Sequence, residues 1–165
     1  MRRRPASGCY RTAKRARSSY AGGKPLIQPD PALVKRAREL LVIEAKLAAE
    51  ANDPTTAAAR LYDKLHAHLA PLVGDAGAQL LFVRSAKLTN GEFAWIATAS
   101  ILDGSAALRE RLQTQDPPVR TEAVAVLFGN FLTLVTTFIG ERLTAQVLLR
   151  AWPTIDEMPR GETSK

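Results

Sequence analysis

The chain has 165 residues, of which 46% are hydrophobic and 24% charged, as expected for one soluble globular domain or one domain with a tail. Its 23 lysines and arginines against 16 aspartates and glutamates give a net charge of +7. Eight of the basic residues and no acidic residue precede Asp30, which leaves 15 basic and 16 acidic residues in the rest of the chain. The body is therefore nearly neutral, and a folded domain that coats nucleic acid with a broadly basic surface is excluded.

Residues 1–29 form a basic tail that is too polar to bury an apolar core, so we expect it to be disordered. Such a tail favours binding to polyanions such as nucleic acid, or to anionic lipid. Alternative interpretations are a solvated extension without a role, a start codon assigned upstream of the true one, or a transit peptide, which the absence of Leu, Ile, Val and Phe before Leu26 argues against. The candidate polyanion-binding residues are Arg2, Arg3, Arg4, Arg11, Lys14, Arg15, Arg17 and Lys24.

Reaction chemistry is scarce in this sequence. The single cysteine, Cys9, cannot form an internal disulfide, which favours a reducing compartment, and we expect a cytoplasmic protein. His66 and His68 lie two residues apart, about 200° around a helix, so they cannot share a metal ion. Nucleophile-elbow, phosphate-loop, dinucleotide-binding and zinc-protease motifs do not occur. We therefore expect no catalytic residue, no metal and no cofactor.

The chain from residue 30 onward is predicted to be helical throughout. Residues 30–153 are expected to form a single domain, and residues 154–165 a polar C-terminal tail. Alternating runs long enough for strands are absent, and the fold class is therefore predicted as all-α, a compact bundle of about six helices.

Helix starts are marked by local capping patterns. An aspartate followed by proline supplies a capping carboxylate and a first helical residue that needs no N–H partner. The spacing of Thr89 and Glu92 is that of a capping box and predicts a helix running to Ile101. Another helix is predicted over 105–114. The three aspartate–proline starts are Asp30-Pro31, Asp53-Pro54 and Asp116-Pro117.

The second predicted helix has the clearest periodicity. Its apolar residues step by 4, 3, 4 and 3 positions, which is typical of a helix with one buried seam. We expect this seam to face the core, with a dimer contact as the alternative. The seam residues are Ala58, Tyr62, Leu65, Leu69 and Leu72.

A weak internal repeat appears at an offset of 66 residues. It aligns Leu72-Val73-Gly74-Asp75 with Phe138-Ile139-Gly140-Glu141, and Leu81–Arg84 with Val147–Arg150. In each copy a long helix would end at a glycine in the left-handed conformation, and a second helix would begin at the acid. The repeat predicts two pseudo-symmetric helical hairpins with corners at Gly74 and Gly140.

The 18 residues from Ala123 to Gly140 carry no charge. As a helix they would reach about 27 Å, close to the thickness of a bilayer core. Asn130 near their centre and the charged counterpart helix favour a buried central helix, with a membrane-associated helix as the alternative. Asn130 is then a candidate buried polar residue, which either bonds a neighbouring backbone group or contacts a ligand.

Taken as a whole, these patterns predict a non-catalytic helical module that acts through protein contacts, with a protein partner or self-association. Trp95 and Trp152 are expected in the core, with a partner contact as the alternative. Two other functions stay open: polyanion binding through the basic tail, and membrane association through helix 123–140.

Overall fold

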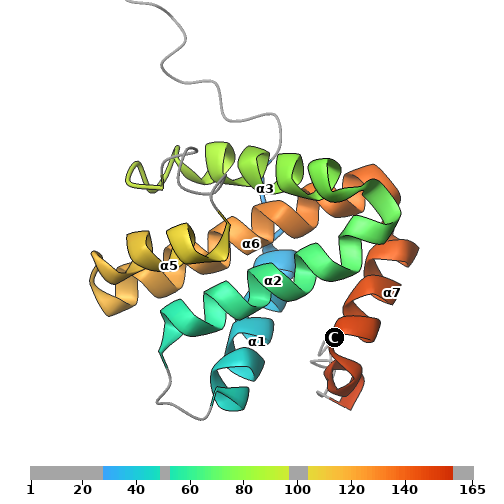
Figure 1. The fold of residues 1–165 in the computed structure, drawn as a ribbon, viewed down its shortest axis with the longest axis horizontal. Helices are drawn as coiled ribbons and strands as arrows, with labels where there is room; N and C mark the ends of the chain where they lie inside the picture. Colours follow the sequence, from blue (N-terminus) through green and yellow to red (C-terminus); the bar gives the residue numbers. More distant parts are fainter. Residues whose placement is uncertain (1–27, 49–52, 97–103, 158–165) are drawn as a thin grey trace, which may run out of the picture.

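The computed structural model describes residues 28–48, 53–96 and 104–157. These residues form six α-helices and one short 3-10 helix, with no strand among them (Figure 1). The predicted all-α bundle is therefore confirmed. The helices are α1 (Pro31–Leu47), α2 (Pro54–Val73), α3 (Asp75–Thr89), α5 (Ser105–Gln113), α6 (Pro117–Ile139), α7 (Glu141–Ala151) and the 3-10 helix η1 (Pro153–Glu157).

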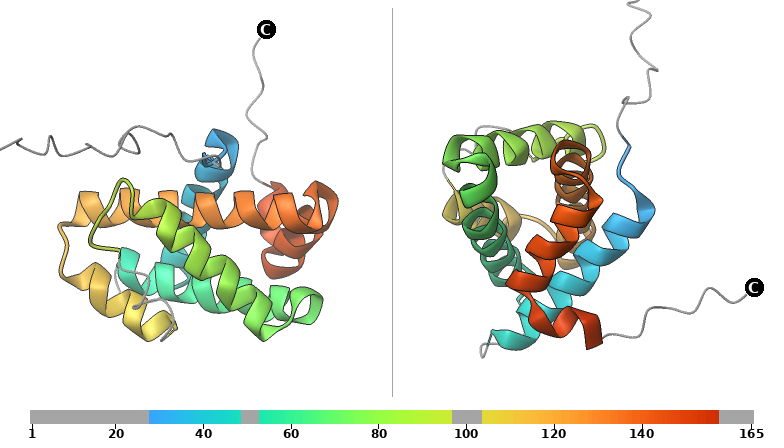
Figure 2. Two further views of the ribbon diagram at one scale, coloured as in Figure 1. Left: turned by 90° about the horizontal axis from the view of Figure 1, so that it is seen from above. Right: turned by 90° about the vertical axis from the view of Figure 1, so that its right-hand side faces the viewer.

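Helix α6 runs through the middle of the bundle, in contact with α1, α2, α3 and α7 (Figures 1 and 2). Twelve of its residues between Ala123 and Val135 are buried. It is the one described helix that is long and apolar enough to cross a membrane, and 67% of its most apolar window is buried inside the bundle. The prediction of a buried central helix is confirmed for these residues. Its last turn differs, because Phe138 is 72% exposed.

The three predicted aspartate–proline starts all open helices. The Asp30 carboxylate accepts a hydrogen bond from the backbone N–H of Ala32, at 2.9 Å. The Asp53 carboxylate accepts from the N–H groups of Thr55 and Thr56, at 3.1 and 3.3 Å. Asp116 occupies the same position before α6 without a capping side-chain bond. The proline sets the helix start in all three cases, whereas the carboxylate adds a cap in two.

The two predicted hairpin corners have the same geometry. Gly74 has φ 81° and ψ 158°, and Gly140 has φ 89° and ψ 157°. This ψ differs from that of the left-handed helical conformation expected from the sequence, and it belongs to an extended region that essentially only glycine enters. Each glycine ends one helix with its N–H and begins the next with its C=O. The N–H groups bond Ala70 and Thr136 at 2.8 and 2.9 Å, and the carbonyls accept from Ala78 and Thr144 at 3.0 and 3.1 Å.

The hairpins pack reciprocally: α3 of the first lies along α6, and α7 of the second lies against α2. In Figure 1, α3 runs in the opposite direction to α6. The rings of Phe82 and Phe131 stack between these two helices, with centroids 3.8 Å apart. Both hairpins thus share one apolar core, which α1 and α5 complete.

The apolar seam of α2 faces this core over four of its five positions. Leu72 is the exception, because it is 50% exposed at the end of the helix. Tyr62 packs its ring 4.2 Å from that of Phe82. Burial raises the pKa of the Tyr62 phenol, and the charge of Asp63 adds to the rise.

The predicted helix start at Thr89 and Glu92 is wrong. Thr89 is the last residue of α3, and the backbone from 90 to 95 forms turns. The Thr89 hydroxyl donates to the Ser85 carbonyl and accepts from the Asn130 amide, so it is buried rather than free to cap a following helix. Residues 97–103, the rest of that predicted helix, lie outside the described residues.

The other predicted boundaries are close to those of the structure. Helix α5 covers the predicted 105–114 helix to within one residue. Packing continues past residue 153, because Ile155 in η1 is buried against the core although the sequence analysis assigns it to the polar tail.

Candidate docking groove between α3 and α6

The most deeply buried charge of the described residues is the Glu44 carboxylate, which is fully enclosed. Its Oε1 accepts from the Trp152 indole N–H at 2.7 Å and from the Lys64 ammonium at 2.5 Å. Arg60 Nε lies 3.3 Å from Oε2. Because this cluster ties α1 and α2 to the end of α7 and admits no solvent to the carboxylate, it holds the fold together rather than offering a site to a ligand.

Asn130 is buried, as its place on α6 requires. Its Nδ2 donates to the Thr89 hydroxyl at 3.0 Å, so its partner is a side chain of α3 and not the neighbouring backbone. Its Oδ1 has no hydrogen-bond partner within the described residues. Asn130 lines none of the three surface hollows described below, and a ligand contact at this residue stays a prediction.

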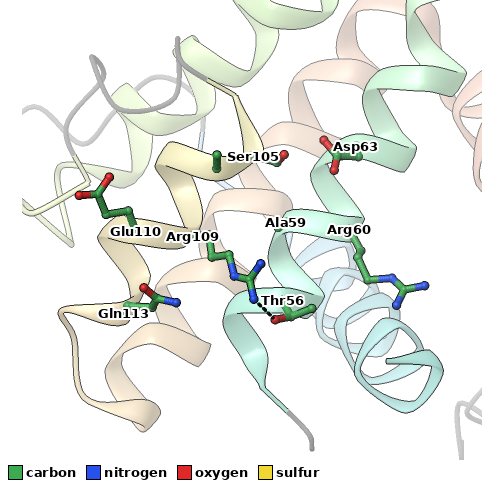
Figure 3. A pocket seen from close by; sticks show the side chains of 9 residues that line it. Thr56, Ala59, Arg60, Asp63, Ser105, Arg109, Glu110 and Gln113 are labelled. Atoms are coloured by element: carbon green, nitrogen blue, oxygen red, sulfur yellow. Dashed lines mark hydrogen bonds between the residues drawn. The ribbon is translucent and has the colours of Figure 1, made fainter. Parts of the chain in front are cut away.

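A polar cleft of about 370 Å³ separates α2 from α5 (Figure 3). Arg109 reaches across it and donates to the Thr56 hydroxyl at 3.1 Å. Arg60 and Asp63 line the α2 side, and Glu110 projects from α5 away from α2 in Figure 3. The two arginines and two acids of this cleft balance each other, so the cleft offers no excess charge to a small ionic ligand.

An apolar groove of about 430 Å³ lies between α3 and the last turns of α6. Leu80 on α3 is 67% exposed and Phe138 on α6 is 72% exposed, the highest values among the large hydrophobic side chains of the described residues. The lining residues of α3 are Gly77, Leu80, Leu81 and Arg84, and those of α6 are Leu134, Thr137 and Phe138. On each helix these residues are adjacent or three or four positions apart, so each helix presents one row to the groove. Val73, the last residue of α2, also lines the groove.

A second hollow, of about 520 Å³, adjoins the groove along α3. Leu80 and Arg84 line both hollows and form the ridge between them. Val83, Lys87 and Leu88 complete the second hollow. The groove and the second hollow are called the docking face from here on. Exposed apolar surface of this kind on a helical bundle is typical of a contact with another molecule.

Helix α3 is apolar on two sides, which explains how the docking face arises. Ala78, Phe82 and Ala86 are fully buried against the core. Leu80 and Val83 lie on the other side of the same helix, where no described helix covers them fully. The four consecutive apolar residues Leu80–Val83 are a signal of this site in the sequence that the predictions above do not use, since a helix cannot turn four consecutive side chains toward one core.

The described candidate site residues of the sequence analysis do not line the docking face. The eight basic tail residues lie within 1–27, outside the described residues. Trp152 is buried, as expected, and Trp95 is half-buried against the core. His66 stacks on Tyr62 with ring centroids 6.3 Å apart. Within the described ranges no group of three His, Cys, Asp or Glu side chains could hold a metal ion.

Comparisons with protein-family models, with curated proteins and with solved structures give no match for this chain. The functional assignment therefore rests on the residues of the docking face and on the physical chemistry of their exposure.

Proposed function

We propose that this chain is a non-catalytic interaction module that binds a helical segment of another protein at the docking face. One observation carries the proposal: Leu80 and Phe138, the two most exposed large hydrophobic residues of the described chain, line the same groove from two different helices. The single cysteine and the burial of α6 support action in the cytoplasm.

The shape of the groove suits a helix better than an extended peptide. Its walls are α3 and α6, which run in opposite directions in Figure 1 and cross obliquely in the left view of Figure 2. An amphipathic third helix can lay its apolar face between such walls. The lining residues of α3 run from Gly77 to Leu88, a length of about 17 Å at 1.5 Å per residue, which about three turns of a partner helix would cover. Burying a leucine or phenylalanine side chain fully contributes about 1.5–3 kcal/mol, so these two anchors supply a useful part of a micromolar affinity.

The proposal is tested by site-specific photo-crosslinking in cells that naturally produce the chain. A benzophenone amino acid replaces Phe138 in one variant and Leu80 in a second. Leu47, which is 57% exposed near the end of α1, is replaced in the matched control. We expect the same cross-linked protein from positions 138 and 80 and none from position 47. Equal adducts at all three positions, or none at 138 and 80, would contradict the proposal.

A mild substitution then tests the docking face in the purified pair. Leu80→Gln introduces the residue type of Gln146, which lies 66 positions later and is exposed on α7. We expect this variant to keep the stability of the bundle and to weaken partner binding about 10- to 30-fold, the equivalent of roughly 1.4–2 kcal/mol. Unchanged affinity would remove Leu80 from the interface.

A second candidate function rests on the charge of the N-terminal tail, where eight basic residues occur without an acid before Asp30. This tail would bind nucleic acid through its phosphates, with an affinity that falls steeply with salt. A full-length variant with these eight residues changed to Gln is expected to lose such binding. Binding that persists in the variant, or that ignores salt, would reject the polyanion role.

A further inference from the structure

We infer that the partner segment is an acidic amphipathic helix, an inference that rests on the proposed function of the docking face. Arg84 lines both hollows, and Lys87 lines the second. Among the described residues that line these two hollows there is no aspartate or glutamate. In this part of the chain the docking face combines apolar anchors with positive charge, and electrostatic complementarity calls for acidic residues on the partner.

Elsewhere in the described chain, basic side chains next to hollows or buried groups have acidic neighbours. Arg60 and Lys64 both approach Glu44. The α2–α5 cleft contains its own acids. By contrast, Arg84 and Lys87 form no ion pair within the described residues, so their charges stay available to a bound molecule.

The order of residues along α3 gives the pattern of the partner. Val73 and Phe138 make one end of the docking face apolar. Arg84 and Lys87 follow Leu80 by one and two helical turns, and Lys87 lies about 10 Å further along the axis. A partner helix that fills the groove would place its apolar residues at one end and its acidic residues one to two turns away, on the side facing α3.

Two other occupants are disfavoured by charge. The chain's own N-terminal segment, residues 1–27, is basic and contains no acid, so it would be repelled by Arg84 and Lys87. A second copy that docks through the same face in a two-fold dimer would bring the same basic residues of both copies to one interface. Another protein with an acidic helix avoids both repulsions.

A display library of helical peptides tests the inference on the full-length chain. Every peptide carries leucine in a fixed pattern of positions i, i+3, i+4 and i+7, and all remaining positions are Glu, Lys or Gln. We expect selection on the wild-type chain to enrich Glu in the turns next to the leucines. The enriched peptide should bind at least tenfold more tightly, measured by fluorescence anisotropy, than the same peptide with Lys at those positions.

Two charge-reversal variants show whether the preference for Glu comes from the docking face or from the basic tail. Arg84→Glu with Lys87→Glu should reverse the preference and enrich Lys. Lys35→Glu with Arg111→Glu changes the net charge by the same amount on exposed residues of α1 and α5, and it should leave the preference for Glu intact. A preference for Glu that survives the first variant would place the acidic contact on the tail and overturn the inference.

The remaining outcomes distinguish the inference from the proposed function. If selected peptides bind through Leu80 but show no preference between Glu and Lys, the docking face stands and the acidic partner is rejected. If no peptide binds the wild-type chain better than a Leu80→Gln, Phe138→Gln variant, the proposed function itself fails. A dimer detected by light scattering that Leu80→Gln dissolves would assign the face to a second copy and overturn the acidic partner.

Discussion

The two hairpins have the same corner geometry, but they differ at one outer position of the second helix. Gly74 and Gly140 have φ values of 81° and 89° and the same pattern of backbone bonds. Leu80 of α3 is 67% exposed, whereas its counterpart at the 66-residue offset, Gln146 of α7, is polar and exposed. Helix α7 is also held at its end by the bond from Trp152 to Glu44.

This difference separates what the fold requires from what it merely tolerates. The shared corner needs a glycine and an apolar inner face, and both hairpins supply them. A leucine at the outer position of Leu80 is needed by neither hairpin, since α7 folds with a glutamine at the equivalent position. The exposed leucine of α3 is therefore free to serve a contact, and substitutions on the two faces should separate stability from binding.

The sharpest comparison uses two phenylalanines of α6 that lie seven residues apart. Phe131 is fully buried and stacks on Phe82, whereas Phe138 is 72% exposed. Phe131→Ala is expected to lower the free energy of unfolding by about 3–5 kcal/mol, and Phe138→Ala by less than about 0.5 kcal/mol. Urea unfolding measures both. A similar loss in the two variants would mean that the groove belongs to the core and is not a docking face.

Glu44→Ala removes the hydrogen bond by which Trp152 holds the end of α7. Removing one member of a buried charged cluster leaves its partners unpaired, although Lys64 and Arg60 are partly exposed and can regain water. We expect a loss of about 3 kcal/mol in the free energy of unfolding, accompanied by a change in the fluorescence of Trp152. Glu122→Ala is the control, because it removes an exposed ion pair with Arg38 and should cost less than about 1 kcal/mol. Equal costs would show that Glu44 does not hold α7.

Two helical glycines extend the comparison to the backbone. A Cβ at Gly129 would lie 2.5 Å from Val34 Cγ2 and 3.0 Å from Val34 Cα, because α1 crosses α6 there. Gly129→Ala is expected to destabilise the chain by about 1–3 kcal/mol.

A Cβ at Gly77, on the docking face, would meet only the side chain of Val73, at 3.3 Å. Gly77→Ala is expected to change stability by less than about 1 kcal/mol, because the gain in helix propensity is set against the close contact with Val73, and thermal unfolding measures the change. A loss at Gly77 as large as that at Gly129 would show that the contact with Val73 does not relax.

Local signals in the sequence were sufficient for most helices. Aspartate–proline pairs and the two corner glycines act through their own neighbours, so the helix starts and the hairpins could be predicted. The capping box at Thr89 failed because its hydroxyl is bonded to Asn130, 41 residues away in the sequence. A local pattern cannot reveal such a tertiary bond.

The candidate site depended on contacts that no local pattern contains. Glu44 resembles any surface glutamate of a helix until Trp152, 108 residues later, donates to it. Leu80 belongs to a helix that is apolar on two sides, and Phe138 to one with a long uncharged stretch, so only the arrangement of the neighbouring helices decides which apolar residues are left uncovered. The interaction role therefore stays a proposal, and the apolar run Leu80–Val83 was the only local signal that pointed to the docking face.

The smallest expected effect concerns the starts of the first helices of the two hairpins. Burial raises the pKa of the Asp53 carboxyl, but hydrogen bonds from the side chains and backbones of Thr55 and Thr56 outweigh it and hold the pKa below its usual 3.8. Asp53→Ala should cost about 1 kcal/mol at pH 7 through the lost cap. Asp116 begins α6 without a capping side-chain bond, so Asp116→Ala should change stability by less than about 0.5 kcal/mol.

The contribution of Asp53 to the free energy of unfolding should decrease as the pH falls. A carboxyl whose pKa is lower in the folded than in the unfolded chain stabilises the fold above the unfolded pKa, and that stabilisation is lost as the pH falls through the folded pKa. The gap in unfolding free energy between the wild-type chain and Asp53→Ala should therefore be constant from pH 7 to about pH 5 and should shrink below the ordinary value of 3.8. Urea unfolding over this pH series measures the gap, with Asp116→Ala as the flat control. A gap that widens in acid would show that the hydrogen bonds from Thr55 and Thr56 do not favour the charged carboxylate, and a gap as flat as that of Asp116→Ala would show that the two helix starts are equivalent.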